Sequence, residues 1–241
     1  MKQISLGVNI DHAATLRQVR GQTTAYPDLQ TLTEIVKKAG GHQITIHLRE
    51  DRRHIQDSDV RLLCRKSALP INLEMAVSDE MLRIALKEKP KWVCFVPEKR
   101  EELTTEGGLN IIKGFSKIQD MTLKLKEKKI KVSFFIDPNL AQVQAASEAH
   151  ADAVEFHTGA WVLARGQAKK KHWNLLSEAS QLAEQLGLRV HAGHGLDFEH
   201  AKRIRKIKSL VEVNIGHSLI CYSLEMGLKK ATQKMRACLK R

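Results

Sequence analysis

Charged side chains crowd the segment HLREDRRH, which spans residues 47–54. Seven of its eight residues are ionisable, and it directly follows ITI, a β-branched run that predicts a buried strand. Imidazoles, carboxylates and guanidinium groups can transfer protons and bind anionic substrates when they meet in one cleft. The segment therefore indicates either a ligand site at a strand end or a solvated turn.

Histidines elsewhere in the sequence favour the ligand site. Five of the 11 histidines follow or end a predicted strand, namely His12, His47, His157, His194 and His217. A single inward histidine is more often a hydrogen-bonded structural residue, although histidine also titrates near neutral pH and serves as an acid or a base. Five of them at equivalent ends of different strands predict one shared catalytic or binding site.

Eight short runs rich in β-branched and aromatic residues alternate with amphipathic helical segments. The runs cover residues 4–11, 42–48, 70–76, 91–98, 131–137, 151–159, 188–193 and 210–216. This alternation predicts an α/β fold, a (β/α)8 barrel (TIM barrel) with extra helices, in which residues 1–241 form a single domain. A doubly wound open sheet is the alternative, but it usually has fewer strands, and no GxGxxG turn follows the first run.

Alternation along each strand separates an apolar side from a polar side. In a barrel the apolar side packs against the helices, so the polar side faces inward and its groups gather at the carboxyl ends of the strands. We therefore expect an inward set formed by Asn9, Asp11, Thr45, His47, Arg49, Asn72, Glu74, Glu155, His157, Glu212 and Asn214.

The inward groups suit proton transfer on a phosphorylated molecule. Glu74, beside other carboxylates, is expected to have a raised pKa and to act as a base. Phosphate sites in such barrels use the last two loops, which here read GHGLD and GHS, and we predict that Asp197 and Ser218 cap the helices that follow. A second anion is expected near Arg20, Arg49 and His54.

A metal-dependent hydrolase or aldolase acting on a sugar phosphate is the alternative among enzymes. His191 and His194 have HxxH spacing, but no HxH opens the first strand and no carboxylate-rich cage is evident. Schiff-base chemistry would need a lysine at the mouth, and only Lys99 is suitably placed. We expect no metal, and we interpret Lys99 as a surface charge.

The formal charge of +13 is concentrated in residues 201–241, which hold 11 Lys and Arg against 2 Asp and Glu. We interpret this segment as the solvated faces of two helices. Nucleic-acid binding is an alternative, but aromatic residues make up only 5% of the chain and none interleaves with the basic runs KRIRKIK and GLKKATQKMRACLKR, so no stacking platform is evident. We do not expect nucleic acid as a partner.

Four scattered cysteines without CxxC spacing favour a reducing cytoplasm over a disulfide framework. Polar Asn9 and Asp11 interrupt any apolar stretch of the kind found in signal peptides. No apolar run approaches the roughly 18 residues of a membrane span. We expect a cytoplasmic protein without membrane contact.

Eight blocks of the sequence resemble, in order, the pyridoxine 5′-phosphate synthase family, PdxJ. They read GVNIDHAATLRQVRG, TIHLREDRRHI, NLEMAV, VPEKREELTTEGGL, FIDP, EFHTG, AGHGL and NIGHSLI. The resemblance implies a transferase of vitamin B6 biosynthesis whose (β/α)8 barrels assemble from dimers into homo-octamers. It also implies ring closure between 3-amino-2-oxopropyl phosphate and 1-deoxy-D-xylulose 5-phosphate. The resemblance implies no metal or organic cofactor. It also implies that no enzyme lysine is required, because the imine forms between the two substrates.

The resemblance also implies roles for individual residues by motif. His47 and Glu74 resemble general bases, His194 a general acid, and Glu155 a residue that stabilises a charged intermediate. Contacts to the aminoketone phosphate are implied for Asn9, Arg20, Gly195, Gly216 and His217, and contacts to the deoxyxylulose phosphate for Asp11, His12, Arg49, His54 and Thr104. The loop after the fourth strand resembles a lid, and Arg20 is expected to reach a neighbouring subunit's site.

Overall fold

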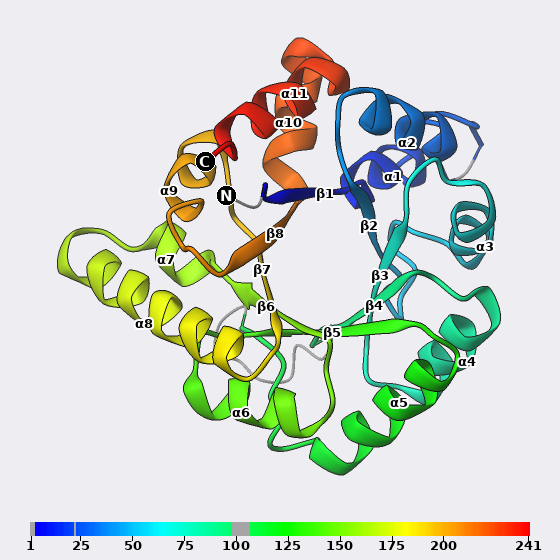
Figure 1. Ribbon diagram of the computed structural model, residues 1–241. Helices are drawn as coiled ribbons and strands as arrows, with labels where there is room; N and C mark the ends of the chain where they lie inside the picture. The colour runs from blue at the N-terminus through cyan, green and yellow to red at the C-terminus, as the bar shows by residue number, and fades with distance from the viewer. Residues whose placement is uncertain (1–2, 22, 98–106) are drawn as a thin grey trace.

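The computed structural model describes residues 3–21, 23–97 and 107–241. Eight parallel strands close into a barrel in which each strand pairs with the next along the chain and β8 pairs with β1 (Figure 1). The predicted (β/α)8 barrel is therefore confirmed. Its strands are β1 (Ser5–Asn9), β2 (Gln43–His47), β3 (Ile71–Met75), β4 (Trp92–Phe95), β5 (Lys131–Ile136), β6 (Ala153–His157), β7 (Arg189–Gly193) and β8 (Leu210–Ile215).

Helices surround the barrel on its outside (Figure 1). Those that connect successive strands are α2 (Leu29–Lys38), α3 (Asp57–Lys66), α4 (Asp79–Glu88), α5 (Phe115–Glu127), α6 (Leu140–Glu148), α8 (Gly166–Gln185) and α9 (Phe198–Ile204), and α11 (Leu228–Cys238) closes the ring. The predicted extra helices come directly after β1, β6 and β8, and they are α1 (Asp11–Gln18), α7 (Gly159–Leu163) and α10 (His217–Met226). In the described parts of the chain, no helix is long and apolar enough to cross a membrane.

The apolar side of the strands packs outward against the helices, as predicted. Val8, Ile46, Leu73, Phe134 and Val213 are fully buried and belong to one continuous apolar cluster that includes helix residues. Each Å² of apolar surface removed from water stabilises the fold by about 25 cal/mol. Shifting any strand by one residue would turn this side inward, so the cluster fixes which side chains point into the barrel.

The polar side of the strands forms a hydrogen-bonded network inside the barrel. Glu212 accepts a hydrogen bond from Gln43 Nε2 at 3.0 Å, and Asn214 Oδ1 accepts one from the Thr45 hydroxyl at 3.0 Å. Asn214 Nδ2 in turn donates to Glu155 Oε2 at 2.7 Å. Because buried polar groups cost free energy unless they are paired, these bonds allow the interior to be polar.

Two strand glycines make room for these inward side chains. A Cβ atom added to Gly7 would lie 1.9 Å from Asn214 Oδ1, and one added to Gly193 would lie 2.2 Å from Glu155 Oε1. Because Gly7 and Gly193 have no side chain, Asn214 and Glu155 can occupy the space beside them.

Candidate active site

Asp11, His47 and Glu74 meet at the carboxyl ends of β1, β2 and β3. Asp11 Oδ1 accepts a hydrogen bond from the backbone N–H of His47 at 2.9 Å, and its Oδ2 accepts one from Asn9 Nδ2 at 2.9 Å. The same Asn9 nitrogen lies 3.5 Å from Glu74 Oε2. One nitrogen or oxygen atom from each of the three residues lies within 4.8 Å of the others. Because these side chains point inward as predicted, three acid–base groups lie close enough together to act on the same substrate.

Burial shifts the pKa values of the carboxyl groups in this cluster. It raises the pKa of Asp11 to about 6, against the opposing effect of neighbouring His47. The pKa of Glu74 is raised well above its ordinary value by burial and by the charges of Glu155 and Asp11. Burial also raises the pKa of Glu155 to about 8, and the hydrogen bond from Asn214 opposes this rise. Carboxyl groups with such values can exchange protons near neutral pH.

A second group of side chains lies across the rim, after β5, β6 and β7. The rings of His157 and His194 lie 4.8 Å apart, edge to face, and His157 Nδ1 is 3.1 Å from Asp137 Oδ1. This contact lowers the pKa of Asp137. Asp137 was missed as a site residue, although it directly follows β5 in the motif FID and so carries the same strand-end signal.

His194 is held in an unusual backbone conformation. Its φ angle is +73°, a left-handed value that non-glycine residues rarely adopt, and the single hydroxyl proton of Thr158 lies between two acceptors, the carbonyls of Gly193 and His194. A Cβ on Gly159 would lie 2.7 Å from His157 Nε2 and 3.2 Å from His194 Cδ2. The pair of imidazoles therefore depends on a glycine at the start of α7 and on a strained turn, which is common at functional sites.

The last two loops form a candidate anion site beside this rim. Helix α10 has no side-chain cap, whereas Asp28 and Ser78 cap α2 and α4, so the first backbone N–H groups of α10 are left for other acceptors. Gly216 precedes that helix, and His217 begins it with its ring 4.8 Å from the ring of His12. Burial and the charge of His217 lower the pKa of His12.

The two predicted caps in these loops have different outcomes. Asp197 does cap α9, because it accepts a hydrogen bond from the backbone N–H of His200 at 2.8 Å. The prediction for Ser218 was wrong: Gly216 occupies the cap position, and the Ser218 hydroxyl donates to the carbonyl of Leu196 at 2.5 Å. Ser218 therefore ties the loop after β8 to the loop after β7, which contains Gly195 at a φ of +77°.

The residues predicted to bind a second anion are only partly gathered. The buried ring of His54 lies 6.0 Å from that of His47, and its pKa is lowered to about 4 by burial and by the charges of His47 and Arg49. Arg49 Nε lies 3.8 Å from Asp51. Arg20 is exposed on the turn after α1 and forms no side-chain hydrogen bond or ion pair within the described residues. Thr104, Lys99 and the first part of the predicted lid lie outside the described residues.

The metal-ligand pattern seen in the sequence does not form a site. His191 is buried inside the barrel, with Nδ1 3.5 Å from Glu212 Oε1, whereas His194 is exposed at the rim. Within residues 3–21, 23–97 and 107–241, the three-residue group that could hold a metal ion is instead Asp11, His47 and Glu74. Two carboxylates and one imidazole from separate parts of the chain therefore meet at the rim, an arrangement that no local spacing in the sequence reveals.

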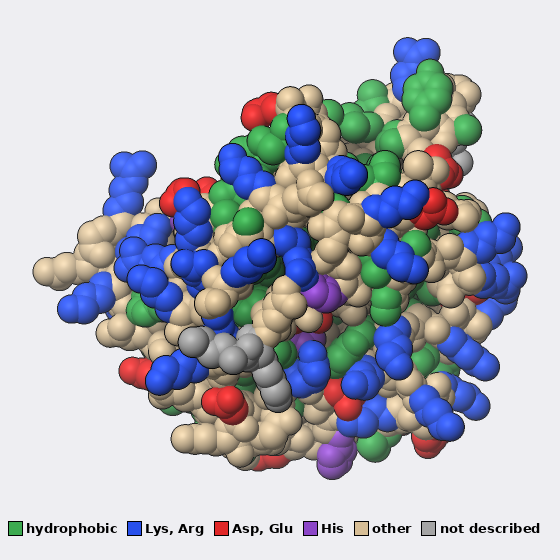
Figure 2. Space-filling view, turned by 45° about the horizontal axis from the view of Figure 1, so that its top comes forward, with side chains coloured by type: hydrophobic (Ala, Val, Ile, Leu, Met, Phe, Trp, Pro, Cys, Tyr) green, Lys and Arg blue, Asp and Glu red, His purple; other side chains and the backbone are tan. Residues whose placement is uncertain are grey.

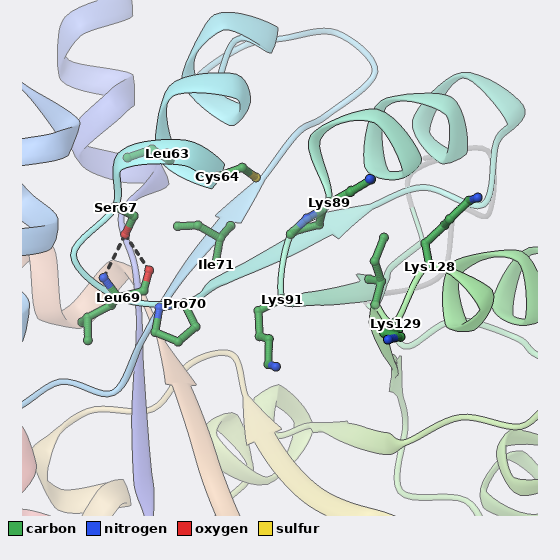
Figure 3. A pocket seen from close by; sticks show the side chains of 12 residues that line it. Leu63, Cys64, Ser67, Leu69, Pro70, Ile71, Lys89, Lys91, Lys128 and Lys129 are labelled. Carbon is green, nitrogen blue, oxygen red and sulfur yellow. Dashed lines mark hydrogen bonds between the residues drawn. The ribbon is translucent and has the colours of Figure 1, made fainter.

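Figure 2 shows histidine and acidic side chains in a depression of the surface, with Lys and Arg side chains around it. The opposite end of the barrel is different. There, a hollow of about 260 Å³ is lined by Lys89, Lys91, Lys128 and Lys129 together with apolar residues that lie beside them (Figure 3). No Asp, Glu or His lines it, so that hollow can attract anions but offers no imidazole or carboxylate for proton transfer.

The fold and this rim define a (β/α)8-barrel enzyme whose acid and base groups lie at the carboxyl ends of the strands. The chain belongs to the family described as pyridoxal phosphate biosynthesis protein PdxJ, whose model matches residues 6–241.

Two similar relatives are both named pyridoxine 5′-phosphate synthase. The one from Bdellovibrio bacteriovorus is 57% identical over 99% of each chain. The one from Pelagibacter ubique is 47% identical over 93% of this chain and 94% of its own. The solved structure of tryptophan synthase from M. tuberculosis matches with a TM-score of 0.63 at 13% identity, covering 99% of this chain and 94% of that one, and this likeness concerns the fold alone.

Proposed function

We infer that this chain is a pyridoxine 5′-phosphate synthase. It condenses 3-amino-2-oxopropyl phosphate with 1-deoxy-D-xylulose 5-phosphate, and the products are pyridoxine 5′-phosphate, inorganic phosphate and water. Family membership supports this reaction. The observation that carries it within the structure is the contact of Asp11, His47 and Glu74 at the barrel rim, where burial raises the pKa values of both carboxyl groups.

The reaction needs several proton transfers, and the rim supplies groups for them. We assign His47 and Glu74 as general bases, since each ends or nearly ends a strand and faces the shared pocket. His194, on the opposite side of the rim, is the general acid that protonates leaving oxygen atoms. Glu155 lies deeper, and once it has given up its proton its carboxylate would stabilise positive charge on the imine formed between the substrates. No metal or organic cofactor is required for these steps.

Two phosphate groups need two anion sites. For the aminoketone phosphate we assign Asn9, Arg20, Gly195, Gly216 and His217, supported by the uncapped start of α10. For the deoxyxylulose phosphate we assign Asp11, His12, Arg49, His54 and Thr104. Arg49 supplies the charge, and His54 would act as a neutral hydrogen-bonding partner because its pKa is lowered.

The test is a two-substrate assay with the purified protein. Phosphate release and absorbance of the pyridine product should both appear, and both should persist after treatment with a strong chelator. Loss of turnover on chelation with recovery on adding one divalent cation per chain would favour the metal-dependent alternative, for which the Asp11, His47 and Glu74 donors are the candidate ligands. Absence of product from both substrates, beside an active relative as positive control, would refute the assignment.

We further propose that the chain assembles into homo-octamers built from dimers and works in the cytoplasm as a single domain. The extra helices support assembly, because they expose apolar side chains: Val19 after α1, Leu163 at the end of α7 and Leu224 in α10 are 76%, 80% and 74% exposed. Arg20 follows Val19 directly. A second subunit that docks on the surface around Val19 would therefore have Arg20 of the first subunit close to the catalytic rim of the second. Light scattering on the eluted protein measures the mass: an octamer is expected, and a monomer would contradict the proposal.

A further inference from the structure

Part of the basic segment near the end of the chain lies beside aromatic rings that belong to other helices. Arg203 of α9 lies over Trp173 of α8, with its guanidinium carbon 5.7 Å from the ring centroid. A hollow of about 550 Å³ occupies the groove between these helices, and it is lined by Lys169, Trp173, Glu199, His200, Lys202, Arg203 and Lys206, of which Glu199 is the one acidic residue. This volume is typical of sites for small molecules. We call this hollow the α8–α9 groove, and it includes none of the residues assigned to the catalytic rim.

The aromatic side chains of the groove are held in place from behind. The buried ring of Trp161, in α7, lies 5.3 Å from Trp173 and 5.2 Å from His200. His200 is also fixed by Asp197, whose Oδ1 lies 2.7 Å from its Nδ1. The indole N–H of Trp161 has no acceptor among the described residues. The rings of Trp173 and His200 in the groove are therefore held in fixed positions by the buried ring behind them.

The charges of the groove are mostly uncompensated. Lys202 pairs with Glu199 at 2.6 Å, and Lys169 donates to the carbonyl of Val162. Arg203 and Lys206 form no ion pair within the described residues. Figure 2 shows Lys and Arg side chains gathered on the side of the molecule that α8 and α9 form. An anion placed here would meet a guanidinium group and an ammonium group that have no partner carboxylate.

We propose that the α8–α9 groove binds a small molecule that carries a flat aromatic ring and a phosphate group. The ring would pack against Trp173 and His200, and the phosphate would be held by Arg203 and Lys206. A guanidinium group can donate two parallel hydrogen bonds to two oxygens of one phosphate. Nucleotides have this chemistry. Pyridoxine 5′-phosphate, the reaction product, has it as well. Of these two candidate ligands, only pyridoxine 5′-phosphate depends on the proposed function.

The experiment is calorimetric titration of the full-length protein with AMP, with pyridoxine 5′-phosphate and with inorganic phosphate. AMP tests the groove independently of the catalytic assignment, and one AMP per chain is expected. Pyridoxine 5′-phosphate is expected at the rim, and at a second site as well if the product is the natural occupant. The Arg203→Ala/Lys206→Ala variant should weaken AMP binding about 10-fold or more, because it removes two charge-assisted contacts. Its turnover of the two substrates should stay unchanged.

Two controls make the result specific to the groove. Lys170→Ala/Lys171→Ala removes the same charge from the neighbouring surface of α8 and should leave AMP binding intact. Trp173→Leu should weaken AMP binding but not the binding of inorganic phosphate. The proposal is overturned if neither aromatic phosphate binds outside the rim, or if both double variants lose AMP equally. It is also overturned if Arg203→Ala/Lys206→Ala changes the mass of the assembly but not AMP binding, since the groove would then be a subunit contact.

Discussion

The two halves of the barrel interior use the same residue types for opposite purposes. We call the part of the interior around Glu212, farther from the carboxyl ends of the strands, the lower half, and the part around Glu74, at those ends, the upper half. In the lower half, Glu212 accepts a hydrogen bond from Gln43 and lies next to His191, and all three side chains are buried. In the upper half, Glu74 is close to Asp11 and His47, and burial, together with the charges of Glu155 and Asp11, raises its pKa. A carboxylate that accepts a hydrogen bond from a buried amide stabilises structure, whereas a buried carboxylate close to other carboxylates is ready to take up a proton.

The difference arises from position along the strand rather than from composition. Glu212 is the third residue of β8, and Glu74 is the fourth residue of β3, one before its end. The barrel opens at the carboxyl ends of its strands, so only the upper group can meet a substrate. The predictions below compare matched substitutions in these two halves, in order of decreasing effect.

The largest effect is expected for His47→Asn, which removes an acid–base group from the rim. Turnover should fall by roughly 10²- to 10⁴-fold, the usual contribution of general acid–base catalysis, while the thermal midpoint stays within a few degrees. His191→Asn makes the same change in the lower half and should keep most of the turnover. Equal losses in the two variants would remove the distinction between the halves.

Glu155, which lies between the halves, should make stability depend on pH. Its folded pKa of about 8 lies above the ordinary value of 4.5, so the folded state holds a proton that the unfolded state has lost between these values. Stability should therefore fall as the pH rises through this window, by at most about 1.4 kcal/mol per pH unit, and no further above it. Urea unfolding of the wild-type chain and Glu155→Gln between pH 5 and 9 measures this. Parallel curves for the two proteins would contradict the raised pKa.

Gly7→Ala tests the packing of the lower half. The new Cβ would lie 1.9 Å from Asn214 Oδ1, and Asn214 cannot move freely because Thr45 and Glu155 both bind it. We expect a loss of about 1–3 kcal/mol in the free energy of unfolding. Gly114→Ala is the control, since its new Cβ would meet only the end of the Ile118 side chain at 3.3 Å. A Gly7→Ala protein as stable as this control would show that the interior is less tightly packed.

The smallest effect is expected for Ser218→Ala, which removes the hydrogen bond between the last two loops. Such a bond contributes about 0.5–1.5 kcal/mol, so KM for the aminoketone phosphate should rise a few-fold while kcat changes little. Ser223→Ala in the same helix removes a hydroxyl that bonds only to the helix carbonyl of Leu219 and should leave KM unchanged. If kcat falls instead, the loop junction acts in the chemical step.

Alternation of strands and helices was enough to predict the barrel and the inward-facing side of each strand. The same alternation predicted that His47 and Glu74 face one pocket, because both lie near the ends of adjacent parallel strands. Local spacing misled for Ser218, which bonds across to Leu196 instead of capping its helix. The HxxH pair, which was not taken as a metal site, divides between the interior and the rim. Arg203 over Trp173 could not be predicted, since the contact joins two helices that no sequence pattern relates.

The most direct test of the two-halves account is the turnover of Glu74→Gln and Glu212→Gln, measured with both substrates on folded protein. The substitution is the same in both, keeps the side-chain volume and removes one carboxylate from the upper or the lower half. The account predicts that Glu74→Gln loses at least about 100-fold in turnover and that Glu212→Gln retains most of it. An active Glu74→Gln, or an equal loss in Glu212→Gln, would contradict it.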